Sequence, residues 1–569
     1  MTFRAELISR LEKNLHKVLL RIVLSPDLEK PVEFTGGMIL EQARAAARRY
    51  AVVDKPGVVL LLLPHSLELF LLHLGLVLEG WLPAILPWPT SRMDPAKYQR
   101  NLLHQLRNLP AQQLITLPRL VSNLAAGLPF PATACTVPGC EALERAYEIP
   151  LPLESAGDGV KAGLDTQPPS DSLFLQFSGG TTGAQKAVVV TAPMMASQMD
   201  RLRDALGFDS SDGVASWLPM YHDMGLIACL WFPLWHGAAS TQISASDWLL
   251  APDLLFSYLD RYQATYCWLP NFAFSYLAGQ RGRMNGPYRL GHVRGFVNCS
   301  EPVRARSMNA FADTFADWGV RRTAPQASYA MAENVFAVTQ TPMGEEPRQT
   351  PRSGLRHAAK SYPPLAFDML DETYVSSGAV LESMEVRIRG VNGDDCAERE
   401  PGEILIRSEA LFSGYWGSQG FLTSSISADG WYSTGDYGFM EAGHLYVIGR
   451  LKDIVIVGGQ NIFPEDVEAV VNALPGVYPG RVVAFGVVDE VNGTEALAVV
   501  AEMRGEWGAA AAKRMEREMQ QGIMAAIGIA PRYTGAVPER WIVKSTAGKI
   551  SRRDTRERFL TEKLRRQPQ

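Results

Sequence analysis

The segment Ser178-Gly-Gly-Thr-Thr-Gly-Ala-Gln-Lys186 concentrates residues that can bind an anion. Glycines let backbone N–H groups close around a phosphate, and the Ser and Thr hydroxyls add donors. Lys186 adds a compact positive charge. The segment is not a Walker loop, because it lacks a Gly-Lys-Ser/Thr step and is followed by a β-branched run at 188–191 instead of a helix. Taken alone, the segment would be better interpreted as a glycine-rich hairpin turn, so other segments of the chain must decide.

Further segments carry residues whose chemistry would complement a phosphate loop. They are Ser216-Trp-Leu-Pro-Met-Tyr-His-Asp-Met-Gly-Leu226, Ser328-Tyr-Ala-Met-Ala-Glu-Asn334, Trp431-Tyr-Ser-Thr-Gly-Asp436, Gly449-Arg-Leu-Lys-Asp453 and Ser545-Thr-Ala-Gly-Lys-Ile-Ser-Arg552. The first contains a Tyr-His-Asp cluster, the second brings an aromatic ring close to a carboxylate, and the last is a second Gly-Lys loop. Any one of these segments is a weak signal, so the functional interpretation depends on their combination and order along the chain.

Predicted strands and helices must position these segments. Residues 58–63 are a predicted buried strand, and the next helix has Ser66 as its N-cap and an apolar stripe of Leu67, Phe70, Leu71, Leu74 and Leu78. Apolar runs at 215–218, 264–269 and 294–298 alternate with helical patterns, and short β-type runs follow at 384–388, 403–407 and 444–448. This alternation predicts sheets covered by helices, an α/β fold.

A second unit is predicted to begin near Arg450. Its elements are a strand-like run at 451–457, a helix at 464–474 with proline in its first turn, strands at 481–488 and 496–502, and a helix at 509–527. Together they predict a compact α+β domain. Two earlier stretches are polar and rich in proline: residues 150–172 are predicted as a surface linker and residues 341–364 as an inserted loop.

The bulk properties exclude several classes of protein. A chain of 569 residues is too long for one ordinary domain, and its net charge of −5 gives no support for nucleic-acid binding. Six cysteines without CxxC pairing argue against a disulfide framework or a zinc site and favour reduced thiols in a cytoplasmic protein. The most apolar stretch, residues 58–86, is interrupted by proline, histidine and glutamate, so no membrane span is expected. The first residues lack a signal-peptide core.

In this order, the phosphate loop and the five further segments resemble the adenylate-forming superfamily of acyl-CoA synthetases, luciferases and peptide-synthetase adenylation domains. The resemblance covers roughly residues 173–553. It implies a large N-terminal domain, residues 1–450, of layered β-sheets with helices plus a β-barrel-like part, which binds the acid and ATP. It also implies a small, mobile α+β C-terminal lid domain, residues 451–569, which carries a catalytic lysine.

Within the superfamily, the chain most resembles the fatty acyl-AMP ligases. This resemblance rests on the Tyr-His-Asp segment, on residues 331–340 and on the insertion before Val375-Ser-Ser-Gly378. In that group the insertion hinders the domain arrangement that CoA requires. Domains that activate amino acids usually carry a Phe-Asp-type segment where this chain has Tyr221-His-Asp, which disfavours a free α-amino acid as substrate.

The resemblance also implies a role for individual residues. The β- and γ-phosphates of ATP would be cradled by Ser178, Gly179, Gly180, Thr181, Thr182, Gly183 and Lys186. Mg²⁺ would be held by Glu333 and Thr182, since it prefers hard oxygen ligands. Tyr329 would stack on adenine, and the nucleotide would be bordered by Ser300, Glu301, Ser328, Ala330 and Met331.

The remaining roles concern the ribose, the hinge and the reacting carboxylate. Asp436, assisted by Arg450, would bind the ribose hydroxyls, and Lys452 would lie at the hinge. Lys549 would bridge the carboxylate and the α-phosphate, and His222 would act as a gate beside them. Each residue also has a structural interpretation: a core tyrosine, a capping histidine, a turn or surface acid, or a solvated lysine.

The chain departs from the superfamily pattern inside the phosphate loop. Gln185 stands where proline is usual and Ala187 where glycine is usual. Lys186 is retained, although some fatty acyl-AMP ligases lack this lysine. The loop is therefore expected to bind phosphate with altered flexibility.

The predicted reaction is the ATP-dependent activation of an apolar, fatty or related carboxylic acid to acyl-AMP with release of pyrophosphate. The acyl group would then pass to the phosphopantetheine thiol of an acyl carrier protein or of a carrier domain in a polyketide or peptide synthase. Such an enzyme would serve fatty acid metabolism or secondary metabolite biosynthesis. An acyl-CoA synthetase is the alternative, and a catalytically silent scaffold on the same fold is a third possibility.

Two features leave both a functional and a structural interpretation open. The basic tail could dock an acidic carrier protein or form a solvated helix; its cations are Arg552, Arg553, Arg556, Arg558, Lys563, Arg565 and Arg566. Trp217, Met220, Met224 and Trp268 could line an acyl pocket or belong to the ordinary core.

Overall fold

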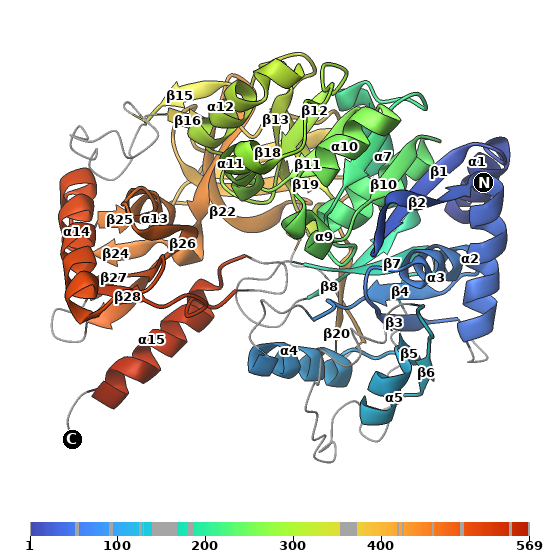
Figure 1. Ribbon diagram of the computed structural model, residues 1–569, viewed down its shortest axis with the longest axis horizontal. Helices are drawn as coiled ribbons and strands as arrows, with labels where there is room; N and C mark the ends of the chain where they lie inside the picture. The colour runs from blue at the N-terminus through green and yellow to red at the C-terminus, as the bar shows by residue number, and fades with distance from the viewer. Residues whose placement is uncertain are drawn as a thin grey trace.

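The computed structural model describes residues 2–51, 56–89, 95–124, 128, 130–138, 168–178, 186–352, 355, 373–417, 420–423, 426–457, 460–489, 494–544 and 549–566. These residues form a large, sheet-rich N-terminal part and a smaller C-terminal part. The smaller part, in orange and red, lies at the left of Figure 1.

A thirteen-stranded mixed sheet spans the large part. Its strands, in spatial order, are β18 (Met384–Arg389), β19 (Gly402–Ser408), β22 (Tyr432–Glu441), β23 (His444–Arg450), β17 (Ala379–Val380), β14 (Ala337–Gln340), β13 (Pro325–Ala330), β12 (Gly295–Asn298), β11 (Tyr266–Leu269), β9 (Gly213–Ser216), β10 (Ala239–Gln242), β1 (Val18–Leu24) and β2 (Asp27–Thr35). The run from β13 to β1 is parallel, and both ends are antiparallel. The carboxyl ends of the parallel strands therefore share one edge, where ligands of such sheets usually bind.

An eight-stranded sheet forms the second layer of strands. Its order is β21 (Gly420–Thr423), β20 (Gly414–Gly417), β8 (Ala187–Thr191), β7 (Ser172–Phe177), β4 (Leu82–Ile85), β3 (Val58–Leu62), β5 (Gln113–Thr116) and β6 (Ala132–Ala134). Alternate residues of β3 face opposite cores: Val59 and Leu61 point to the main core, while Val58, Leu60 and Leu62 join a second core. Burial on both faces explains why this strand is a continuous apolar run.

Helices cover both sheets of the large part. They are α1 (Phe3–Lys13), α2 (Gly36–Tyr50), α3 (Leu67–Leu78), α4 (Pro95–Asn108), α5 (Pro118–Leu124), α7 (Ala192–Leu206), the π-helix η2 (Met224–Trp231), α8 (Phe232–Trp235), α9 (Ala245–Leu250), α10 (Leu254–Tyr262), α11 (Asn271–Gln280) and α12 (Ala305–Thr314). The predicted N-cap of α3 is confirmed, since the Ser66 hydroxyl accepts a hydrogen bond from the Leu69 N–H at 3.3 Å. Figure 1 shows α4 and α5 below the eight-stranded sheet and α10 to α12 over the other layer.

The C-terminal part is built on a three-stranded sheet. It contains β24 (Val455–Val457), β25 (Gln460–Ile462), α13 (Pro464–Asn472), β26 (Val477–Asp489), β27 (Thr494–Met503), α14 (Ala509–Ile527), β28 (Tyr533–Val537) and α15 (Arg552–Arg566). The predicted helix at 509–527 is confirmed residue for residue as α14. A separate core of apolar residues from α13, α14 and the sheet supports this α+β unit.

One predicted strand is wrong in its first half. Residues 451–457 were expected as a single strand, but Leu451–Asp453 form a 3₁₀ turn, η6, and β24 begins only at Val455. In this turn the Asp453 carboxylate lies 3.0 Å from the Arg552 guanidinium. The apolar pattern of residues 451–457 does not predict such a contact with a residue distant in sequence.

The inserted loop and the linker are described only in part. Residues 341–352 lead from β14 into β15 (Gln349–Pro351), which pairs with β16 (Thr373–Val375) as a two-stranded ribbon. The rest of the predicted insertion, except residue 355, and most of the predicted linker lie outside the described residues. Within the described ranges, no helix has the length and apolarity needed to cross a bilayer.

Candidate active site

The predicted phosphate loop connects two adjacent strands of the eight-stranded sheet. Strands β7 and β8 pair antiparallel with Phe177 opposite Ala187, and the Ser178 N–H donates to the Lys186 carbonyl at 2.9 Å. The strand–loop–strand prediction is thus confirmed. Ser178 is buried and Lys186 is exposed at the two ends of the loop, while Gly179, Gly180, Thr181, Thr182 and Gly183 lie outside the described residues.

Glu333 sits on a strained turn that faces the loop. It occupies a 3₁₀ turn, η5 (Ala332–Asn334), which ends at Val335 with φ of +60°. A β-branched residue rarely adopts positive φ, so the fully buried surroundings of Val335 must hold this conformation. The Tyr415 hydroxyl donates to the Glu333 carboxylate at 3.0 Å, and the Lys186 ammonium lies 4.7 Å from the centre of the Tyr415 ring.

The environment of Glu333 favours a cation. Burial raises the pKa of its carboxyl, the hydroxyl of Tyr415 opposes the rise, and the negative charge of Asp223 adds to it. A bound cation would reverse that pKa shift by stabilising the carboxylate. Among the described residues, no group of three or more His, Cys, Asp or Glu side chains could hold a metal ion. A carboxylate that shares Mg²⁺ with phosphates needs no such cluster.

Tyr329, Asp436 and Arg450 form a connected group from three strands. The Tyr329 hydroxyl donates to Asp436 Oδ2 at 2.6 Å, and Arg450 Nε lies 3.1 Å from Asp436 Oδ1. Asp436 and Arg450 are direct partners in the β22–β23 register. Burial would lower the pKa of Arg450, but Asp436 and its other acidic neighbours raise it overall, so Arg450 stays charged. The structure therefore brings together the residues predicted to contact the adenine ring and the ribose.

The other predicted nucleotide-binding residues have structural partners. The Ser328 hydroxyl donates to the Thr339 carbonyl at 2.7 Å, while Ala330 and Met331 are half-buried at the end of β13. Ser300 adopts φ of +73°, and the Glu301 carboxylate accepts the Phe272 N–H in the first turn of α11 at 2.9 Å. Glu301 therefore caps a helix, as an acid at a helix N-terminus does.

His222 meets an aspartate that the sequence analysis did not select. His222 Nδ1 lies 2.6 Å from Asp223 Oδ1, where η2 begins. Burial alone would raise the pKa of Asp223, but His222 and Lys549 lower it below its ordinary value. The charge of Lys549, from the C-terminal part, therefore acts on a carboxylate of the large part. The available sequence signal for Asp223 is the Tyr-His-Asp cluster after a strand.

Lys452 lies in the turn η6 between the two parts. Burial lowers the pKa of its ammonium, and the charges of Arg450 and Lys186 act in the same direction. Lys452 therefore stands within electrostatic range of both Arg450 and Lys186. Its predicted role at a hinge stays a prediction.

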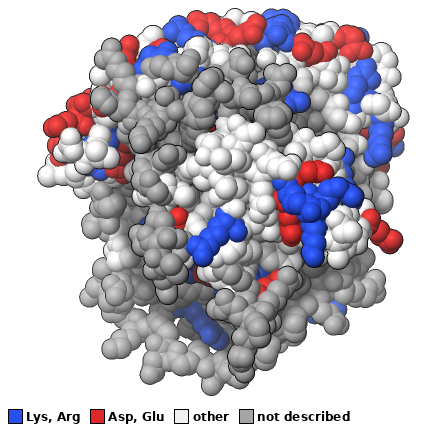
Figure 2. Space-filling view, turned by 90° about the vertical axis from the view of Figure 1, so that its left-hand side faces the viewer, with Lys and Arg blue, Asp and Glu red and all other residues white. Residues whose placement is uncertain are grey.

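The arginines of the basic tail have partners within the C-terminal part. Arg552 binds Asp453, Glu465 and Glu468, Arg553 pairs with Glu557, and Arg558 pairs with Glu562. Arg556 donates to the Gly486 carbonyl at 2.8 Å. On the face shown in Figure 2, basic and acidic side chains are interspersed. These contacts favour the structural interpretation of the described part of the tail.

The residues considered for an acyl pocket divide into two groups. Trp217 stacks on Trp248 with ring centres 3.8 Å apart, and Phe272 meets both rings edge-on. Trp268 is fully buried and packs edge-on against Phe232, so it belongs to the core. Trp217 follows β9 and stands five residues before His222 in the sequence, while Trp248 comes from α9.

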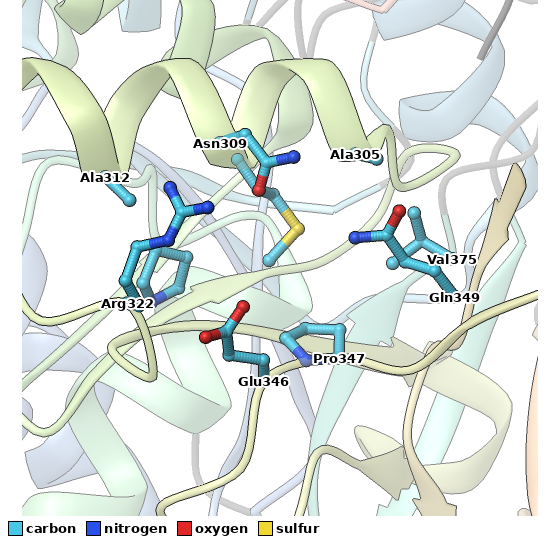
Figure 3. A pocket seen from close by; sticks show the side chains of 10 residues that line it. Ala305, Asn309, Ala312, Arg322, Glu346, Pro347, Gln349 and Val375 are labelled. Atoms are coloured by element: carbon cyan, nitrogen blue, oxygen red, sulfur yellow. The ribbon is translucent and has the colours of Figure 1, made fainter. Parts of the chain in front are cut away.

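A small pocket lies away from these residues. It is enclosed by α12 and by the start of the insertion, with Asn309, Arg322, Glu346, Gln349 and Val375 around it (Figure 3). None of the predicted site residues lines it. The candidate site is therefore defined by the convergence of side chains from both sheets and the C-terminal part.

Residues 29–416 match the family of AMP-binding enzymes. The chain belongs to this family. It is an adenylate-forming ligase, and ATP is the nucleotide such enzymes use. The match begins within β2 and ends within β20, and it includes the segment between β7 and β8 and the turn that carries Glu333.

Relatives and solved structures agree with this assignment. Long-chain-fatty-acid--AMP ligase FadD32 of Mycobacterium marinum is 30% identical over 451 residues, covering 70% of this chain and 71% of the relative. FadD26 of the same organism, also named a long-chain-fatty-acid--AMP ligase, is 27% identical, and the match covers 93% of this chain and 91% of the relative. A structure from a study of fatty acyl-adenylate ligases of E. coli and L. pneumophila superposes with a TM-score of 0.79 at 22% identity, covering 98% of each chain.

Proposed function

We propose that this AMP-binding enzyme converts an apolar carboxylic acid and ATP into acyl-AMP and pyrophosphate. The observation that carries the proposal is the connected Tyr329–Asp436–Arg450 group, together with the charge of Lys549 acting on Asp223. Lys549 comes from the C-terminal part, whereas Glu333 and the Tyr329–Asp436–Arg450 group belong to the large part. The residues proposed for catalysis and nucleotide binding therefore come from both parts of the chain.

The first step joins two anions, so it needs charge neutralisation and positioning more than proton transfer. Lys549 would lie between the substrate carboxylate and the α-phosphate, with His222 beside them. Ser178, Lys186 and the loop between them would hold the β- and γ-phosphates. Glu333, with Thr182, would hold Mg²⁺, which would neutralise phosphate oxygens when bound. Asp436 and Arg450 would fix the ribose, and Tyr329 would lie against adenine.

The acid is proposed to be fatty or otherwise apolar. The stacked indoles of Trp248 and of Trp217, five residues before His222 in the sequence, supply apolar surface suited to such an acid. Two relatives are named long-chain-fatty-acid--AMP ligases, and those names support an acid of this class here as well.

The protein is proposed to be cytoplasmic. The cysteines that the structure describes have free thiols, which supports a reducing compartment; they are Cys135, Cys229, Cys267, Cys299 and Cys396.

In the second step the acyl group would pass to the phosphopantetheine thiol of a carrier protein or carrier domain. We place the boundary of a movable lid, residues 451–569, at the turn η6. Rotation there would withdraw Lys549 and admit the thiol. The names of the relatives favour the carrier over free CoA, because they describe ligases that form AMP derivatives.

Acid-dependent exchange between pyrophosphate and ATP tests the first step. Fatty and aryl acids should support exchange, and a folded preparation that exchanges with none of them would contradict adenylation. Loading of a holo-carrier protein, compared with formation of acyl-CoA, tests the second step. Efficient acyl-CoA formation without carrier loading would show that the enzyme is an acyl-CoA synthetase.

Lys549→Ala should separate the two steps. We expect it to lose adenylation by about 100-fold or more, as expected when a group that stabilises developing charge is removed. Transfer of the acyl group from pre-made acyl-AMP should continue. Single-turnover assays of each half-reaction measure this difference, and an equal loss in both would contradict the assigned role.

A further inference from the structure

Tyr415 lies between two residues with opposite charges and different proposed tasks. Its hydroxyl donates to Glu333 Oε1 at 3.0 Å, while the face of its ring lies 4.7 Å from the Lys186 ammonium. Glu333 is carried by a turn after β13 in the thirteen-stranded sheet, and Lys186 precedes β8 in the eight-stranded sheet. The side chain of Tyr415 therefore connects the two sheets within the site.

The strand that carries Tyr415 is fixed by backbone register. In β20, Tyr415 pairs with Val188 and Trp416 pairs with Ala187, the residue next to Lys186. The Trp416 indole N–H donates to the Pro110 carbonyl at 2.7 Å and holds the strand from its other side. The position of the ring relative to Lys186 is consequently set by strand pairing and not by a flexible loop.

The polar end of Tyr415 is held equally firmly. Its hydroxyl lies 3.3 Å from the Tyr432 hydroxyl, and its ring packs on Phe412 with centres 4.6 Å apart. The Phe412 N–H in turn donates to the Glu333 carbonyl at 2.8 Å.

We propose that Tyr415 is a positioning residue for the Mg²⁺–ATP complex. Its hydroxyl orients the Glu333 carboxylate toward the metal, and its ring holds the Lys186 ammonium toward the terminal phosphates. This division of labour rests on the proposed function, because it takes Glu333 as the metal ligand and Lys186 as the phosphate ligand. Ring and hydroxyl thus have separable effects, one on ATP and one on the metal.

Two substitutions separate these effects. Tyr415→Phe keeps the ring under Lys186 and removes only the hydroxyl, whereas Tyr415→Leu removes both. Tyr266→Phe is the control, because it removes a buried hydroxyl that donates to the Leu206 carbonyl at 2.7 Å and is not part of the site. Binding of ATP is measured calorimetrically in EDTA. Binding of Mn²⁺, as a paramagnetic substitute for Mg²⁺, is measured by electron paramagnetic resonance with saturating ATP.

Tyr415→Phe should bind metal-free ATP like the wild type but bind Mn²⁺ about tenfold more weakly, because a charged hydrogen bond is lost. Tyr415→Leu should in addition bind metal-free ATP about threefold more weakly, because it lacks the cation–π contact. Unchanged Mn²⁺ binding in Tyr415→Phe would overturn the role of the hydroxyl. Equal loss of metal-free ATP binding in both variants would overturn the role assigned to the ring.

A double-mutant cycle keeps the proposal testable if Tyr415→Leu folds poorly. If Tyr415 acts on the metal through Glu333, then Tyr415→Phe should have no further effect on Mn²⁺ binding in a Glu333→Gln background. Additive losses would overturn the inference. These measurements use no acid, so a wild-type enzyme that fails to exchange pyrophosphate would contradict the proposed function and leave the result for Tyr415 interpretable.

Discussion

At the scale of single residues, Asp223 organises the reacting end of the site. It contacts His222 at 2.6 Å and, although buried, has its pKa lowered by the charges of His222 and Lys549. It also raises the pKa of Glu333. One carboxylate therefore interacts electrostatically with the lysine, the histidine and the proposed metal ligand.

Asp223→Asn should reduce adenylation without weakening ATP binding. Removing the charge eliminates a strong hydrogen bond of the kind that contributes about 1.5–3 kcal/mol, so acid-dependent exchange should fall about tenfold or more. The Tyr329–Asp436–Arg450 group is untouched, and ATP affinity should be retained. Exchange kinetics and calorimetric ATP titration check this pair of outcomes. Full exchange activity, or loss of ATP binding, would contradict it.

At the scale of elements, helix α13 carries an unusual concentration of buried charge. Arg552 lies 2.9 Å from Glu465, 3.0 Å from Glu468 and 3.0 Å from Asp453. Burial raises the pKa of Glu468 to about 7; the charge of Arg552 opposes this rise, and the charge of Glu465 adds to it. Three carboxylates share one guanidinium, so the cluster ties α13 and the turn η6 to the start of α15.

Glu468 should make the stability of the enzyme depend on pH. Its ordinary pKa is 4.5, so between about pH 4.5 and 7 the folded state holds a proton that the unfolded state has released. Stability from this group is therefore present at low pH and is lost as the pH rises toward 7. The melting temperature should fall less between pH 5 and pH 8 in Glu468→Gln than in the wild type. An equal fall in both proteins would show that Glu468 is ionised at both pH values.

Several elements follow from local sequence, while others depend on distant partners. The helices α3 and α14 and the strands β7 and β8 were predicted, because Ser66, the apolar stripes and the β-branched runs specify them locally. Strand β20 was not predicted, since its four residues pair with β8, more than two hundred positions earlier. Asp223 and Tyr415 were missed as site residues for the same reason: their roles arise from contacts with Lys549, Glu333 and Lys186.

At the scale of the whole molecule, one carboxylate joins the two parts. Asp466, near the start of α13, lies 2.9 Å from Arg352 and 3.8 Å from Arg304, both in the large part. Arg304 also donates to the Glu465 carbonyl at 3.3 Å. Arg352 leaves the first strand of the insertion and stacks on Tyr374 from the second. The base of the insertion thus helps to hold helix α13 of the C-terminal part against the large part.

Asp466→Asn should loosen the orientation of α13 against the large part. The two arginines lose their common counter-charge, which is costly at a buried site. Pyrophosphate exchange should fall about threefold to tenfold, since a charged contact between the parts is lost. Transfer from pre-made acyl-AMP should be unaffected, and limited proteolysis should cleave near residue 452 more quickly. Asp317→Asn, in an exposed pair with Arg281, is the matched control. If transfer fell in parallel with exchange, Asp466 would support the fold and not the orientation.

The pairing of β20 with β8 also constrains how the chain acquires its structure. Val188 meets Tyr415, and at the opposite end of the large part Leu20 meets Ser240. Contacts so far apart in sequence are slow to form, because a long loop must close before any of them is made. During synthesis, more than two hundred further residues must be added after β8 before its partner strand β20 is made. We therefore expect the pairing of β8 with β20 to be a late step in the folding of the large part.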